Sequence, residues 1–231
     1  MDNISMETTP LYDVSNPILQ VDWSWKKWKA LITEKGRPTN PLYVVDYKSM
    51  STPTLIFTSP STNDVIGTGT LHPISINARY EIHGAKGKLK ALKRFETEYT
   101  HLSHAYSDDE RPVAMRWITV GGGFQSWDFI CLDEQNMPVA KFSASIWAVS
   151  KMGYIEFIGP KATSQAARDE IVVVSLTLFN CMLLRVSSML SLFGAFIARP
   201  GPLDKEAVYP SHELQPIRYT DNSDPSRIKQ D

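Results

Sequence analysis

The sequence predicts a β-rich (α+β) fold, a closed antiparallel β-barrel of about a dozen strands around one central hydrophobic helix near the C-terminus. Three observations lead to this prediction. Short runs of strand character alternate with turn residues between 42 and 158. The later runs place apolar residues at every second position, and the chain is almost continuously apolar from 171 to 198.

The strand-like runs are bounded by Gly, Pro, Asn, Asp and Ser, which mark turns. The segment Asp-Glu-Gln-Asn at 133–136 predicts a hairpin turn, and the three glycines at 121–123 predict a loop. The runs cover 42–47, 54–58, 65–71, 78–83, 88–99, 113–120, 126–132, 139–149 and 153–158.

Alternation is clearest from Val139 onward, where every second residue is apolar and several of these are small. One face of this strand therefore suits close approach by another element. Trp127, Phe129 and Cys131 repeat the pattern with larger side chains. The apolar positions of the later run are Ala140, Phe142, Ala144, Ile146 and Ala148.

The apolar segment predicts a helix over 164–198. Thr163 or Ser164 can cap its start, and Pro200 stops it. The segment is long enough to cross a bilayer, which takes about 20 apolar residues. Arg185 near its middle opposes that reading, and the preceding strands need an apolar partner. The sequence favours a core helix, with Arg185 near the barrel mouth in water or paired.

We expect one barrel domain at 41–198, an N-terminal arm at 1–40 that packs on it, and a Pro-rich, charged tail at 199–231. Apolar residues make up 42% of the 231 residues and charged residues 21%, which is ordinary for a globular protein. The formal net charge of −1 argues against general nucleic-acid binding.

The cysteine content indicates a reducing compartment. Cys131 and Cys181 both lie in apolar surroundings, so we expect buried, reduced thiols and no disulfide partner. The N-terminus lacks a basic region followed by an apolar run, so we expect no signal peptide. A cytoplasmic location, with peripheral contact at membranes, is the expectation that follows.

Two segments carry a family resemblance. RWITVGGGFQSWDF at 116–129 and IEFIGPKATSQAARDEI at 155–171 resemble segments of fungal proteins with the tubby C-terminal-like domain. Tubby proteins, LURP-one-related proteins and phospholipid scramblases share this fold. The resemblance spans roughly 41–198 and implies a barrel threaded by a helix. It also implies binding of phosphoinositides through basic side chains on neighbouring strands, or, as in scramblases, membrane insertion.

The best candidate binding site is a basic stripe. Five positive charges fall within nine residues, and in an extended chain most of them point to one face. Such a stripe suits a phosphorylated head group or an anionic membrane surface. The alternative is a solvated edge strand, which lysines protect against aggregation. The stripe consists of Lys86, Lys88, Lys90, Lys93 and Arg94.

A second candidate combines tryptophan with lysine. Such a cluster suits a membrane interface, where indole rings lie at head-group depth. The alternative, which the large aromatic side chains favour, is a segment that covers one end of the barrel. The cluster consists of Trp23, Trp25, Lys26, Lys27 and Trp28.

No nucleophile motif or cofactor loop points to catalysis. His101 and His104 share a spacing that could hold a metal, although a flexible acidic loop explains them better. The sequence therefore favours a non-catalytic module that binds anionic phospholipid, without a cofactor or metal. The alternative is a small-molecule-binding protein or enzyme at a barrel mouth, with Arg116, Asp128 or the two histidines as candidates.

Overall fold

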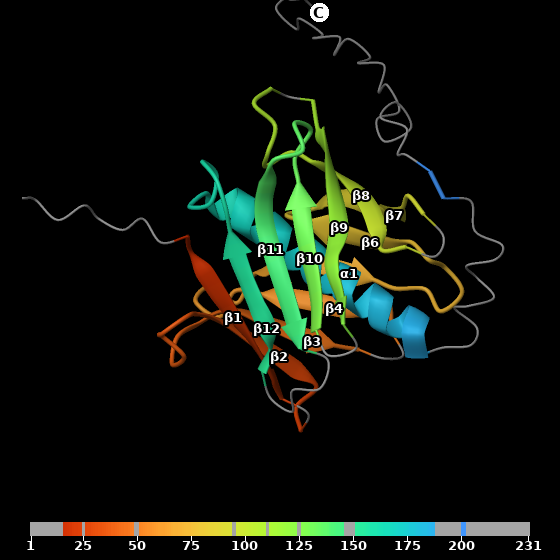
Figure 1. Ribbon diagram of the computed structural model, residues 1–231. Coiled ribbons are helices and arrows are strands. Elements are labelled where there is room, and N and C mark those ends of the chain that lie inside the picture. The colour runs from red at the N-terminus through yellow and green to blue at the C-terminus, as the bar shows by residue number, and fades with distance from the viewer. Residues whose placement is uncertain are drawn as a thin grey trace, which may run out of the picture.

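Twelve antiparallel strands close into one barrel, in which each strand pairs with its neighbours in sequence and β1 pairs with β12. This arrangement confirms the predicted fold class. In the computed structural model, shown in Figure 1, the described residues are 16–24, 26–48, 51–93, 96–109, 111–123, 126–145, 151–187 and 200–201. The elements are β1 (Ile18–Ser24), β2 (Lys29–Glu34), β3 (Pro41–Tyr47), β4 (Leu55–Thr58), β5 (Val65–Thr70), β6 (Ala78–Ile82), β7 (Ala85–Ala91), β8 (Glu98–Ser103), β9 (Val113–Gly123), β10 (Ser126–Leu132), β11 (Pro138–Ser145), β12 (Lys151–Phe157) and α1 (Gln165–Ser187).

Helix α1 runs through the barrel interior. Figure 1 shows it between β9, β10 and β11 on one side and β3, β4 and β6 on the other. Residues 171–174 are fully buried, and Val173 packs so closely on β5 that a Cβ at Gly67 would lie 2.9 Å from its Cγ2. On the opposite wall, the Phe179 ring centroid is 5.6 Å from that of Phe142. The apolar helix thus fills the space that the strands enclose. Within the described residues, no helix combines the length and apolarity that a membrane crossing requires.

The ends of α1 match the sequence in two respects. Ser164 caps the start, since its carbonyl accepts the Arg168 N–H at 3.0 Å and its Oγ faces the Ala167 N–H at 3.5 Å. Near the other end, Arg185 donates a 2.6 Å hydrogen bond to the Tyr99 hydroxyl. Residues 188–198 of the predicted helix lie outside the described residues.

Several expectations for the strands hold. Ala140, Phe142 and Ala144 all face the core, as the alternation predicted. Asp133 starts the β10–β11 turn, where its Oδ1 accepts the N–H groups of residues 135 and 137. Cys131 and Cys181 are buried free thiols.

Residues 18–34, which we expected in an N-terminal arm, form β1 and β2. Leu19, Val21, Ala30 and Ile32 of these strands are fully buried, so the short apolar pattern was sufficient for two strands. Their pairing is also what closes the barrel, because β1 joins β12 to β2. Residues 1–15 and 202–231 lie outside the described part of the chain.

Two other expectations were wrong. The run at 88–99 contains no Gly or Pro and predicts one strand, but the chain turns within it and forms parts of β7 and β8. The glycines at 121–123 belong to β9 rather than to a loop. Gly122 and Gly123 pair with Trp127 and Ser126 of β10, and pairing of the backbone does not require side chains.

Candidate functional site

The basic stripe lies mainly on β7. Lys86 and Lys88 are exposed and Lys90 is half-buried, while Leu89 and Ala91 between and beyond them are fully buried. The prediction that alternate lysines share an outward face is therefore confirmed for these three. The closed barrel pairs β7 with β6 along five residue pairs, so this strand is not a free edge on that side.

Lys93 is bound to other groups of the protein. Its Nζ lies 2.6 Å from Glu96 Oε2 and 3.1 Å from Glu98 Oε2. Hydrogen bonds to these two carboxylates raise the pKa of Lys93. Two acids thus already neutralise this charge, and Arg94 lies outside the described residues.

Two rows of side chains cross the outer face of β5, β6 and β7. The strands are in register, so each row joins residues directly opposite one another, at a strand spacing of about 4.8 Å. A hollow of 450 Å³ lies over these rows. The rows are Thr70–Arg79–Lys88 and Thr68–Glu81–Lys86.

Three cations stand out in these rows, and we call Arg79, Lys86 and Lys88 the basic face. Within the described part of the chain, none of the three has a hydrogen bond or a salt bridge to another side chain. Arg79 lies directly opposite Lys88, and like charges opposite one another destabilise a sheet. Sequence reasoning missed Arg79, although its alternation with Ala78 and Tyr80, both buried, could have placed it outside.

The tryptophan cluster lies at the tip of the β1–β2 hairpin. The Trp23 ring packs edge-on against Tyr47 at 4.3 Å and against Trp28 at 6.3 Å. Lys26 and Lys27 are exposed, as is Trp28 at 56%. Trp23 thus packs against Tyr47 of β3, whereas Trp28 faces outward.

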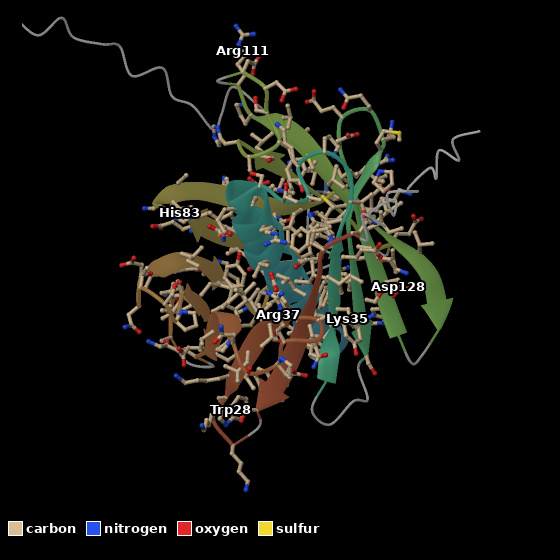
Figure 2. All side chains as sticks on the ribbon, turned by 90° about the vertical axis from the view of Figure 1, so that its left-hand side faces the viewer. Trp28, Lys35, Arg37, His83, Arg111 and Asp128 are labelled. Carbon is tan, nitrogen blue, oxygen red and sulfur yellow. The ribbon has the colours of Figure 1, made fainter. Side chains whose placement is uncertain are left out.

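The two candidate clusters are not brought together. The β6–β7 turn, which contains His83, lies at the mouth where α1 begins, whereas Trp28 lies at the tip of a hairpin at the other mouth, as Figure 2 shows. β1 and β7 are also six strands apart in the ring. The two clusters therefore lie on different parts of the barrel surface. Trp25 lies outside the described residues.

A polar cluster that the sequence did not predict surrounds Asp169 at the mouth where α1 begins. Its Oδ1 accepts hydrogen bonds from the Tyr43 hydroxyl at 2.7 Å and from Gln165 Nε2 at 2.6 Å. Its Oδ2 lies 2.8 Å from His83 Nε2. Burial and the nearby Asp169 charge raise the pKa of Tyr43. His83 has a φ of 48° beside Gly84, and this His-Gly pair between two strands was the available turn signal.

His101 and His104 point into different environments. His101 is fully buried, with Nε2 3.1 Å from Glu170 Oε1, whereas His104 is exposed. Nowhere in the described ranges do three or more metal-binding side chains converge. His101 therefore links β8 of the barrel wall to α1.

The other residues considered for a catalytic role are engaged on the outer face. Arg116 Nη1 lies 3.5 Å from Glu98 Oε1, and Asp128 Oδ2 lies 3.2 Å from Lys141 Nζ. Figure 2 places Asp128 across the barrel from His83. These side chains do not converge on a common mouth.

Comparison of the chain with protein-family models, curated proteins and solved structures gives no match. The tubby-like assignment therefore stays a prediction, and the fold alone does not determine a function. The basic face is the arrangement with the clearest chemistry, because its positive charges lack partners within the described part of the chain.

Proposed function

We propose that this protein is a non-catalytic module that docks peripherally on anionic phospholipids, with phosphoinositides as its preferred ligands, on the basic face of a tubby-like barrel. The observation that carries the proposal is the placement of Arg79 directly opposite Lys88, with Lys86 two residues along β7. An anion that bridges these cations would remove their mutual repulsion.

The chemistry of the row Thr70–Arg79–Lys88 suits a phosphate group. Arg79 offers a planar fork of N–H donors, Lys88 adds a point charge, and Thr70 adds a hydroxyl donor. Each basic side chain close to an anionic surface contributes on the order of 1 kcal/mol. Two or three such residues support reversible docking, which weakens as salt screens the charges.

The second row supports a preference for an inositol ring. Glu81 lies between Thr68 and Lys86, and its carboxylate would repel a bare anion. A sugar ring beside the phosphate carries hydroxyl donors, which a carboxylate accepts. A phosphate over Arg79 and Lys88 with a hydroxyl-bearing ring over Glu81 therefore satisfies both rows.

Liposome co-sedimentation tests the docking. Vesicles with phosphoinositide should retain the full chain at low salt and release it at high salt. The double variant Arg79→Ala/Lys88→Ala should lose most of this binding. Lys35→Ala/Arg37→Ala, an equal change in charge at exposed positions near the β2–β3 turn, is the matched control. Equal loss in both double variants, or no salt-sensitive binding, contradicts the proposal.

Glu81→Ala tests the head-group preference. If only net charge matters, this variant should bind both phosphoinositide and phosphatidylserine vesicles more tightly. If Glu81 accepts ring hydroxyls, binding to phosphoinositide should fall while binding to phosphatidylserine rises. A parallel rise for both lipids would leave docking intact but would remove the preference for inositol.

A further inference from the structure

The seam between β7 and β8 is open over most of its length. The two strands pair only at Lys90–Thr100 and Ala91–Tyr99. In contrast, β8 and β9 pair along six positions. Toward the mouth where α1 begins, β7 and β8 separate and leave a hollow of 690 Å³, which we call the seam cleft.

The position of Tyr80 explains the shape of the seam cleft. Its ring lies over Gly87, where an added Cβ would come within 2.1 Å of the ring. Its hydroxyl donates a 2.9 Å hydrogen bond to the Leu102 carbonyl of β8. Tyr80 thus spans the opening from inside and provides it with an aromatic floor. The apolar lining consists of Tyr80, Ile82, Ala85, Leu102, Ala105 and Ala166.

Polar groups of the seam cleft lie at its rim or are already bonded. Lys86 and Lys88 line both this cleft and the hollow of the basic face, so β7 alone separates the two. Glu170 also lines the cleft. Its Oε1 lies 3.1 Å from His101 Nε2, and its Oε2 accepts a hydrogen bond from the Ala105 N–H at 3.4 Å. The cleft therefore combines a cationic rim with walls that offer little to a polar ligand.

We infer that the seam cleft binds one alkyl chain of an anionic lipid whose phosphate is held at Lys88, a side chain that lines both the cleft and the hollow over Arg79. This inference rests on the proposed function and adds to it a site for the lipid tail. Charge complementarity at the rim and continuity with the basic face argue for this occupant. An extended peptide fits less well, because the Leu102 carbonyl, which a new strand would need, already accepts the Tyr80 hydroxyl.

Titration calorimetry with the full chain tests the inference. The probes are inositol trisphosphate, hexyl phosphate and decyl phosphate, the last two below their micelle concentrations. Decyl phosphate should bind with a stoichiometry of one. Each methylene buried should tighten binding about fourfold. Ala166→Trp, which fills the cleft from the exposed first turn of α1, should abolish the dependence on chain length. Thr163→Trp, an exposed position outside the cleft lining, should not.

The results separate this inference from the proposed function. Binding of inositol trisphosphate with no gain from hexyl to decyl phosphate overturns the cleft and leaves head-group docking standing. A gain that Ala166→Trp does not alter also overturns it. A gain lost in Ala166→Trp, with no binding of inositol trisphosphate, supports the cleft and overturns phosphoinositide docking. Should Ala166→Trp fail to fold, photolabelling of the native chain by a diazirine-bearing decyl phosphate decides. Labels at 80–88 or 102–105 support the cleft, and labels elsewhere overturn it.

Discussion

The indole N–H of Trp117 donates a hydrogen bond to Nδ1 of His101, with the two nitrogens 3.2 Å apart. An indole nitrogen can only donate, so Nδ1 accepts and the imidazole carries its proton on Nε2. That Nε2–H points at Glu170 Oε1, 3.1 Å away. A chain of two hydrogen bonds thus joins β9 through β8 to the first turns of α1.

His101→Phe should destabilise the fold strongly. The substitution keeps the volume but leaves the Trp117 N–H and the Glu170 carboxylate without this partner inside the protein. Each buried polar group left unpaired costs about 1–3 kcal/mol. Urea unfolding should show a loss of about 2–5 kcal/mol. Glu170→Gln, which retains an acceptor for the histidine, should lose less. Equal stability of wild type and His101→Phe would contradict the chain of bonds.

Charge reversal on β7 should separate stability from binding. Lys88→Glu places a carboxylate opposite Arg79, so the unfolding free energy should rise by about 0.2–1 kcal/mol while lipid binding falls. Lys86→Glu places a second carboxylate opposite Glu81, so both stability and binding should fall. Chemical unfolding combined with vesicle binding measures both effects. The prediction fails if Lys88→Glu destabilises the protein as much as Lys86→Glu does.

Gly69→Ala should weaken the packing of α1 against β5. A Cβ at this position would lie 2.5 Å from Thr177 Oγ1 and 2.9 Å from Leu55 Cδ1. The helix or these two side chains must therefore shift, at a cost of about 1–3 kcal/mol in unfolding free energy. Thr177→Ala removes one of the two close atoms. Combining it with Gly69→Ala should make the glycine substitution less costly than it is alone, and strictly additive losses would count against direct contact.

Cys181 should make stability depend on alkaline pH. Burial raises the pKa of its thiol to about 11, from an ordinary value of 9.0. As pH rises, the thiol therefore loses its proton in the unfolded chain before it does so in the folded protein. The stability that the protonated thiol contributes to the folded state is present below about pH 9 and is lost as pH rises toward 11. Relative to Cys181→Ala, the wild type should lose about 1 kcal/mol between about pH 8 and about pH 10. Parallel pH profiles of the two proteins would refute this.

The strands were predictable where turn residues bounded them. The alternating pattern correctly predicted that Ala140, Phe142 and Ala144 are buried, because successive side chains of any strand point to opposite faces. The split of the run at 88–99 was not predictable in the same way, since no Gly or Pro marks the turn. Its position follows from the partners that β7 and β8 find on β6 and β9.

The candidate site was predicted only in part. The sequence indicated Lys86 and Lys88 by their clustering, but Lys93 is held by Glu96 and Glu98. Arg79 belongs to the site because the His83-Gly84 turn sets the register of the β6–β7 hairpin, a local signal that sequence reasoning did not use. The separation of the tryptophan cluster from the basic face likewise depends on the order of strands around the barrel.

By itself, the sequence determined the structural elements of this protein: alternating strands, one apolar helix, and a strand rich in lysine. These are properties of neighbouring residues, which short-range sterics and hydrophobic periodicity govern. The tertiary structure alone decided that Asp169 meets His83 and that β7 parts from β8. Those contacts depend on closure of the barrel around α1, which brings together residues far apart along the chain.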